Sequence, residues 1–306
     1  MSTAGSTRAI LAALLANAGI AIAKFVGFLI TGSSSMLAES VHSVADTSNQ
    51  GLLLFGQRQA RKQADDVHQF GYGRSRYFYS FVVALVLFTL GSVFALYEGY
   101  HKISHPSELT SPVVAIVILV LAIGLESYSF RTAVVESRPL KGPGSWWRFI
   151  RTSRSPELPV VLLEDTGALI GLVLALVGVG LSMLTGEPVW DGVGTAAIGV
   201  LLGVIAVILM IEMHSLLIGE GATSQEDRAI RAALEQTENV DRLIHIRTQY
   251  LGPDELLVGA KIALPADTDL ATVAATIDAA EAAIRAAVPA AKIIYLEPDL
   301  DRALTA

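Results

Sequence analysis

Three side chains that could bind a metal ion lie within the stretch Met36–Gln50, inside a run apolar enough to cross a membrane. They are Glu39, His42 and Asp46. Because an α-helix turns by about 100° per residue, their offsets of three and four place all of them on one helix face. Imidazole and carboxylate are ligands that Zn²⁺ prefers, and ionisable groups in a membrane span usually mark an ion pathway. The stretch predicts a divalent-metal site; the alternative is a polar patch that only holds helices together.

A second acidic pair, Glu164 and Asp165, lies in another apolar run. Neighbouring helical residues point about 100° apart, so the two carboxylates need not face the same cavity. One could bind the metal while the other orients a ligand or pairs with a buried cation. The alternative is a helix-end pair at the membrane surface, because Glu157 and Pro159 come shortly before it.

The composition is that of a polytopic membrane protein. Of the 306 residues, 52% are hydrophobic and only 17% are charged, and the mean hydropathy of +0.53 is too high for a soluble domain of this size. The chain has no cysteine, so disulfides and thiolate metal sites are excluded, and any metal must be held by nitrogen and oxygen. The net charge of −7 argues against a nucleic-acid partner.

Six apolar segments are each long enough to cross a bilayer core, which takes about 20 residues. They are Ile10–Thr31, Met36–Phe55, Tyr79–Tyr97, Val113–Phe130, Leu158–Leu184 and Val193–Leu217. Basic residues are concentrated in the loops after the second and fourth segments, so the positive-inside rule places the N- and C-termini in the cytoplasm. Residues 1–218 are therefore predicted to form a six-helix transport domain in the lipid bilayer.

Residues 219–306 are predicted to form a small cytoplasmic α+β domain. Hydrophobic periodicity indicates five elements: a helix at Gln225–Glu235, strands at Leu243–Tyr250 and Leu256–Leu264, a second helix, and a strand at Lys292–Leu296. Asp267 or Thr268 is the expected cap of the second helix. The order α-β-β-α-β is typical of a domain whose helices cover one face of its sheet.

The chain resembles the cation diffusion facilitator transporters over nearly its full length. The motifs that carry the resemblance are His42-x-x-x-Asp46, DDVHQFGYG at Asp65–Gly73, and Asp165. The six spans and the order of elements in the tail agree with it. The signatures of the branch of the ninth human zinc transporter resemble Ala38–Gln50 and Val160–Gly171, so the chain is similar to that branch in particular.

The resemblance implies a homodimeric transporter, not an enzyme, that exchanges a divalent metal ion for protons. It also implies a transport site built from pairs of ligands four residues apart on the second and fifth spans. Three of these positions hold suitable side chains: His42, Asp46 and Asp165. The fourth is Val161, which cannot coordinate a metal. Glu164, Glu39 or a water molecule could complete the shell.

Two further metal sites of the family are matched only in part. In the loop after the second span, Asp65 and His68 match, but Tyr72 stands where a histidine ligand can occur. In the tail, His245 matches one ligand, whereas Ile293–Asp299 lacks the histidine of another. A tail with little or no tightly held metal is therefore expected.

The resemblance further implies an ion pair that braces the helices at the cytoplasmic face, within or between protomers, for which Arg74 and Glu220 are the candidates. Only MSTAGST precedes the first apolar run, which leaves no room for an Arg-rich transit peptide. A multi-pass protein of a bacterial plasma membrane is expected.

The predicted function is efflux of Zn²⁺ by proton antiport. Ligation requires neutral imidazole and ionised carboxylates, so metal and protons compete for the same lone pairs. Mn²⁺, Fe²⁺, Co²⁺ and Cd²⁺ stay open as substrates. Two other classes stay open as well. One is an intramembrane metal-dependent hydrolase, which the absence of HExxH disfavours. The other is a non-transporting scaffold with a degenerate metal site, which Val161 favours.

Overall fold

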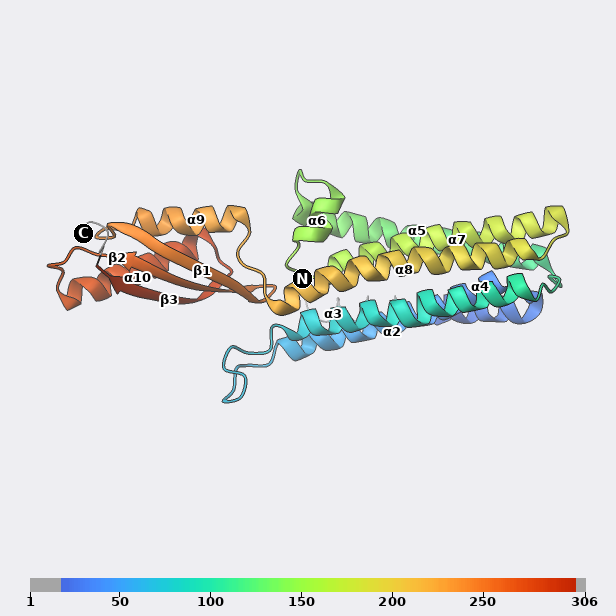
Figure 1. Cartoon of the computed structure of the whole chain (residues 1–306), viewed down its shortest axis with the longest axis horizontal. Coiled ribbons are helices and arrows are strands. Elements are labelled where there is room, and N and C mark those ends of the chain that lie inside the picture. The colour runs from blue at the N-terminus through green and yellow to red at the C-terminus, as the bar shows by residue number, and fades with distance from the viewer. Residues whose placement is uncertain (1–17, 301–306) are drawn as a thin grey trace. The chain divides into compact units, whose positions relative to one another are not determined.

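A computed structural model describes residues 18–300, so positions 10–17 of the first predicted span lie outside the described residues. Most of the chain is helical, and three strands lie together near the C-terminus (Figure 1). The described chain divides into two compact units. The first contains residues 18–57, 78–151 and 156–213, and the second contains residues 58–77, 152–155 and 214–300.

Long helices build the first unit. In chain order, the helices that contribute to it are Ala18–Thr31, α2 (Ser34–Ala60), α3 (Ser75–Val86), η1 (Leu87–Val93), α4 (Phe94–Ser104), α5 (Pro112–Lys141), α6 (Trp146–Thr152), α7 (Glu157–Thr185) and α8 (Val189–Ile218). α3, η1 and α4 form one continuous helix with a π-helical segment in its middle. Together with α5, α7 and α8 it gives four helices, among those described, that are long and apolar enough to cross a membrane. The helix Ala18–Thr31 is shorter and α2 is more polar, so the count of six spans stays a prediction.

Small residues let neighbouring helices of this unit approach each other closely. The hydroxyl of Ser92 donates a hydrogen bond to the carbonyl of Gly199 on α8, at 2.8 Å. A Cβ on Gly99 would lie only 2.6 Å from the backbone nitrogen of Ala196. Glycine at this position therefore allows α4 and α8 to touch through their backbones, as is common between spanning helices.

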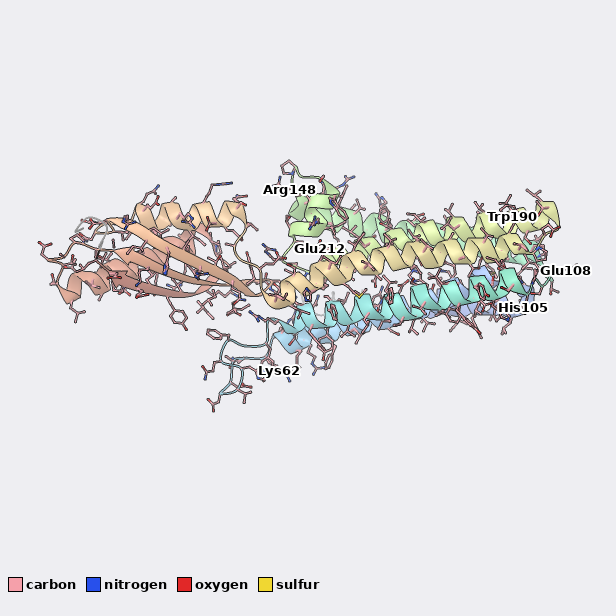
Figure 2. The ribbon with its side chains drawn as sticks, viewed as in Figure 1. Lys62, His105, Glu108, Arg148, Trp190 and Glu212 are labelled. Atoms are coloured by element: carbon pink, nitrogen blue, oxygen red, sulfur yellow. The ribbon has the colours of Figure 1, made fainter. Side chains whose placement is uncertain are left out.

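Polar side chains are found at the two ends of the first unit. Figure 2 shows His105, Glu108 and Trp190 at one end, and Arg148 and Glu212 at the other, near α6. Arg151, also on α6, pairs with Glu212 at 3.0 Å. Charged and aromatic side chains at both ends of an apolar helix bundle are the arrangement expected in a membrane.

The first turn of α2 is capped by an aspartate from α8. The Asp191 carboxylate accepts hydrogen bonds from the backbone nitrogens of Ser34 and Ser35, at 2.8 and 3.3 Å. It also accepts from the hydroxyls of Ser33 and Ser34, at 2.9 and 3.1 Å, and it is fully buried. The first N–H groups of a helix have no partner within the helix. Asp191 satisfies two of them and ties the start of α2 to α8.

Asp191→Ala is expected to lower the free energy of unfolding by about 1–3 kcal/mol for each buried donor left without an acceptor. Thermal melting of the purified protein in detergent measures the effect, and Glu187→Ala is the matched control because Glu187 is exposed just before α8. Equal melting temperatures for the two variants would contradict this role of Asp191.

The second unit contains the predicted α+β domain. Its elements are α9 (Ser224–Glu235), β1 (Arg242–Gly252), β2 (Glu255–Ala263), α10 (Leu270–Ala287) and β3 (Ala291–Asp299), which confirms the order α-β-β-α-β. β2 lies in the centre of the sheet, antiparallel to β1 and parallel to β3. The helices and one face of the sheet enclose a hydrophobic core that includes Ile230, Val258 and Ile284.

The cap of α10 lies slightly later in the chain than the sequence predicts. It is Asp269, whose Oδ1 accepts hydrogen bonds from the backbone nitrogens of Ala271 and Thr272, at 2.9 and 3.1 Å. Asp267 and Thr268 belong to the preceding turn, so the predicted cap was wrong by one or two residues. Asp269 takes the role because its carboxylate reaches the free N–H groups of the first turn.

Part of the loop after α2 packs on the β1–β2 hairpin within the second unit. A Cβ on Gly73 would lie 2.7 Å from the carbonyl oxygen of Leu251, so the two backbones are in direct contact. Arg76 pairs with Asp254 of the hairpin turn at 3.1 Å. Glycine at position 73 therefore makes this close docking of the loop sterically feasible.

The ion pair of Glu220 differs from the predicted one. Glu220 accepts hydrogen bonds from Arg154 and, at 2.5 Å, from the hydroxyl of Ser215. Arg154 also donates to the carbonyl of Gly221 at 3.0 Å. The flat guanidinium group can serve both neighbouring acceptors. Within one protomer Arg154 is therefore the partner of Glu220, and an Arg74–Glu220 pair between two protomers stays a prediction.

Candidate metal transport site

α2 and α7 contact each other at two levels along their length. The amide nitrogen of Asn49 donates to Oε1 of Glu164 at 2.7 Å. Farther along, a Cβ on Gly171 would lie 2.6 Å from Oε1 of Glu39. Asn49 follows Glu39 in the chain, whereas Glu164 precedes Gly171, so the two helices run antiparallel. The two predicted halves of the site therefore face each other.

A small cavity of about 20 Å³ lies between these helices and α5. Four carboxylic side chains line it: Asp46, Glu126, Glu164 and Asp165. Ser43, Gln50 and Val161 complete the lining. A volume of about 10–15 Å³ holds one water molecule, so the cavity has room for one small ligand. The structure thus places Asp46, Glu164 and Asp165 around one cavity, a point that the sequence left open for Glu164 and Asp165, and it adds Glu126.

His42 lies beside this cavity without lining it. Its Nε2 is 3.5 Å from Oδ2 of Asp46, and the side chain is 1% exposed. Neither ring nitrogen has a hydrogen-bond partner among the described residues, and the same holds for the buried Oδ1 of Asp46. Buried polar atoms are normally hydrogen-bonded. These three atoms are therefore available to a ligand.

The donors are not gathered around one point. Within residues 18–300, no three His, Asp or Glu side chains stand close enough together to hold one metal ion. His42 and Asp46 are one helical turn apart on α2, and Asp165 is held by Ser129 of α5, whose hydroxyl donates to its Oδ2 at 3.2 Å. Metal binding at these residues would require their side chains to converge on the cavity.

Glu39 has a cationic partner of its own. Its Oε2 lies 3.1 Å from the ammonium nitrogen of Lys24, which also donates to the hydroxyl of Ser43 at 2.8 Å. Both charged side chains are almost completely buried. A buried carboxylate requires a compensating cation. Lys24 supplies that charge, and Glu39 does not line the cavity.

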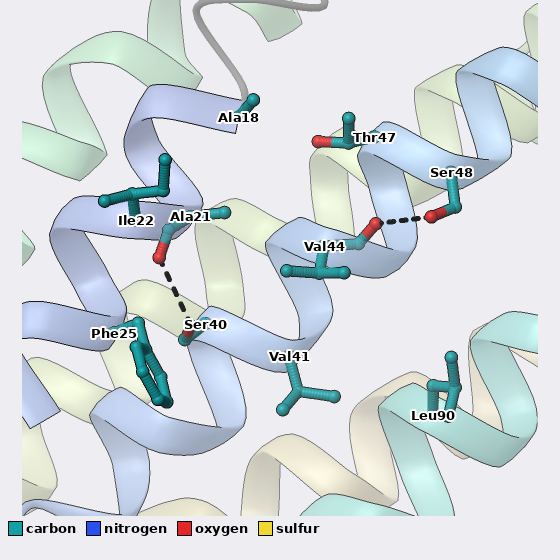
Figure 3. A pocket seen from close by; sticks show the side chains of 10 residues that line it. All are labelled: Ala18, Ala21, Ile22, Phe25, Ser40, Val41, Val44, Thr47, Ser48 and Leu90. Carbon is teal, nitrogen blue, oxygen red and sulfur yellow. Dashed lines mark hydrogen bonds between the residues drawn. The ribbon is translucent and has the colours of Figure 1, made fainter.

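The opposite face of α2 borders an apolar groove of about 510 Å³ (Figure 3). Ile22, Phe25 and Val44 are among its lining side chains. No ionisable side chain lines this groove, so it cannot serve as a metal site. Ser40 links α2 to the helix Ala18–Thr31, because its hydroxyl donates a hydrogen bond to the carbonyl of Ala21 at 3.2 Å. α2 thus has two different faces. Its apolar face borders the groove, and its polar face carries the candidate ligands.

Asp65 and His68 lie in the loop that belongs to the second unit. Asp65 Oδ1 accepts from the backbone nitrogens of Val67 and His68, at 3.0 and 2.6 Å. Asp65 Oδ2 accepts from the hydroxyl of Tyr72 at 2.6 Å, and this bond lowers the pKa of the Asp65 carboxyl below its usual value. The Nδ1 of His68 lies 3.5 Å from Asp65 Oδ1. The two predicted ligands are therefore adjacent, and the hydrogen bonds to Asp65 also shape the loop.

His245 of the predicted tail site is exposed on β1. It borders a shallow pocket together with Arg247, Tyr295 and Glu297. The guanidinium group of Arg247 in this lining would disfavour a bound cation. The expectation of a tail with little tightly held metal stays a prediction.

Sequence reasoning missed two ionisable residues of the membrane unit, Lys24 and Glu126. Both lie in apolar runs, and the rule that singled out Glu39 applies equally to them. What the sequence could not show is that Lys24 faces Glu39 or that Glu126 faces the cavity. Those contacts depend on how the helices pack.

A family model described as the cation efflux transmembrane domain matches residues 10–218. The chain belongs to the cation efflux family. This finding confirms the resemblance to the cation diffusion facilitator transporters, whose members are transporters and not enzymes.

Relatives of this cation efflux protein include human SLC30A9, named a mitochondrial proton-coupled zinc antiporter. It is 29% identical over 260 residues, which cover 84% of this chain and 46% of the relative. The Xenopus laevis protein of the same name is 31% identical over 78% of this chain and 43% of the relative. The chain thus spans about half the length of these relatives. Their similarity confirms the branch that the sequence motifs indicate.

Two further matches come from magnetosome proteins. MamB of a Magnetospira strain is 26% identical over 84% of this chain and 82% of its own length. Among solved structures, the nickel form of a variant MamM C-terminal domain covers 26% of this chain and 98% of its own, with 17% identity and a TM-score of 0.25.

Proposed function

We propose that this cation efflux protein exports Zn²⁺ across a membrane in exchange for protons, with His42, Asp46 and Asp165 as principal ligands. The observation that carries the proposal is the cavity between α2, α5 and α7, with His42 and its unpartnered ring nitrogens beside it. Family membership and relatives named as zinc antiporters support the same substrate.

The charge of the site explains why protons would be exchanged for the metal. Four carboxylic groups surround a cavity in a membrane unit, and the buried Lys24 is already paired with Glu39. Ionised carboxylates are costly at membrane depth unless a cation accompanies them. The cavity must therefore hold either a metal ion or protons. Ligation needs ionised carboxylates and a neutral imidazole, so binding of one cargo releases the other.

Convergence of the donors provides a link between binding and movement. In the described structure the candidate ligands do not share one point. Bringing His42 and Asp46 of α2 towards Asp165 of α7 would draw these two helices together. We propose that this closure favours exposure of the site to the other side of the membrane, as alternating access requires.

Other features of the proposal extend beyond the site. We propose a homodimer, cytoplasmic termini, a domain boundary between residues 218 and 219, and a secondary metal site at Asp65 and His68. A bacterial plasma membrane stays a prediction, because the vertebrate relatives are named mitochondrial and the Magnetospira relative is named a magnetosome protein.

Metal flux into proteoliposomes tests the proposal, with Zn²⁺, Mn²⁺, Fe²⁺, Co²⁺ and Cd²⁺ compared under an imposed pH gradient. We expect zinc uptake into the vesicles to rise when the lumen is more acidic than the outside, and each uptake step to release protons from the lumen, which therefore becomes more alkaline. Absence of flux for every cation would contradict the proposal. Absence of metal binding in calorimetry would favour a scaffold, and metal-dependent proteolysis by the purified protein would favour a hydrolase.

A further inference from the structure

One position of α7 in the cavity lining lacks a metal donor. Val161 and Asp165 are one turn apart on α7, and both line the cavity. Asp165 offers a carboxylate, whereas the isopropyl group of Val161 offers no lone pair. If α2 and α7 alone built the site, Glu164 would be the remaining donor. Its Oε1 already accepts a hydrogen bond from Asn49 at 2.7 Å, so only its Oε2 is left for a metal ion.

α5 brings an additional carboxylate to the same cavity. Glu126 lines it and is half-buried. Ser129, three residues farther along α5, donates to Asp165. Residues three apart lie on the same side of a helix. The Ser129–Asp165 hydrogen bond therefore fixes the α5 face that carries Glu126 against α7, along which α5 packs closely.

Unpartnered atoms beside the acids point to a ligand. The side chain of His42 is only 1% exposed, and both its ring nitrogens lack a hydrogen-bond partner in the described part of the chain. Its Nε2 lies 3.5 Å from Asp46, which lines the cavity and also has a buried unpartnered oxygen. A group of carboxylates alone would be satisfied by protons, but an imidazole with two unused nitrogens beside them is suited to a metal ion.

We infer that Glu126 is a metal ligand of the transport site and supplies the oxygen donor that Val161 cannot. This inference rests on the proposed function and assigns the site to α2, α5 and α7. The ligand set is then one imidazole nitrogen and carboxylates from Asp46, Asp165 and Glu126. Such a set takes a divalent cation and, because oxygen predominates, accepts Mn²⁺ or Fe²⁺ more readily than a nitrogen-rich site would.

Glu126→Gln keeps the shape of the side chain and removes its charge. We expect it to weaken Zn²⁺ binding by the full-length protein at least about tenfold in calorimetry, since loss even of groups that only support ligands costs about 10–100-fold. Glu136→Gln is the matched control, because Glu136 is exposed on the same helix. Its affinity should equal that of the wild type.

Val161→Asp in the Glu126→Gln background tests the ligand role directly. It places a carboxylate on the cavity wall where α7 lacks one, and we expect it to restore most of the lost affinity. Glu126→His offers a second test: it keeps a donor but trades oxygen for nitrogen, so the ratio of Zn²⁺ to Mn²⁺ affinity should rise. A purely structural role of Glu126 would produce neither result.

The outcomes separate this inference from the proposed function. If Glu126→Gln binds zinc like the wild type while Asp165→Asn does not, Glu126 is no ligand and the proposed function stands. If Glu126→Gln is weak but Val161→Asp restores nothing and Glu126→His leaves metal preference unchanged, the ligand role is also overturned. If the wild type binds and transports no metal, the proposed function itself fails.

Discussion

Asp46→Asn and Asp165→Asn are each expected to reduce zinc transport in proteoliposomes by more than about 100-fold, because groups that only support metal ligands already account for 10–100-fold. Asparagine keeps the size and shape of aspartate and can still accept the hydrogen bond that Ser129 donates to Asp165. It cannot provide an anionic oxygen to a metal ion. It also cannot take up the proton that replaces the metal, so both halves of the exchange are lost.

The fluorescence of a zinc indicator inside the vesicles measures zinc uptake, which is divided by the amount of reconstituted protein for each variant. Asp267→Asn is the control, since Asp267 is exposed in the second unit. Full zinc transport by either Asp46→Asn or Asp165→Asn would show that the metal does not travel through the cavity between α2, α5 and α7.

Lys24→Met is expected to lower the free energy of unfolding by about 3–5 kcal/mol, because it leaves Glu39 as a buried charge without its partner. Glu39→Gln should be destabilising for the corresponding reason, with Lys24 left unpaired. The double variant Lys24→Met/Glu39→Gln removes both charges. Replacement of a whole buried ion pair by neutral groups is often close to neutral, so it should recover most of the lost stability.

Melting of the detergent-solubilised protein measures stability, and zinc flux of the same variants measures function. Ser43→Ala serves as a reference for the stability changes. It removes the hydrogen bond between Lys24 and Ser43 and keeps the ion pair, so the free energy of unfolding should fall by about 1 kcal/mol. Recovery of zinc flux in the double variant would show that Glu39 serves as the partner of Lys24. A stable double variant without flux would instead make Glu39 a ligand, and additive losses would disprove the ion pair.

Local periodicity was sufficient to find the polar face of α2 that carries the candidate ligands. The three- and four-residue spacing of Glu39, His42 and Asp46 places them on one face of α2 whatever the rest of the chain does, because the helical repeat is a property of the backbone. The apolar runs and the α-β-β-α-β order of the tail are local patterns of the same kind. The motif around Asp165 identified the family without any knowledge of the packing.

Contacts between distant segments were decided only by the tertiary structure. Glu39 and Asp46 are both acids on the polar face of α2, yet one is neutralised by Lys24 and the other lines the cavity. Nothing in their local sequence distinguishes them. The difference arises from which helix packs beside each residue, since a buried charge is governed by the groups within a few ångströms of it. For the same reason only the packing of α5 against α7 places Glu126 in the cavity, and only the fold pairs Arg154 with Glu220.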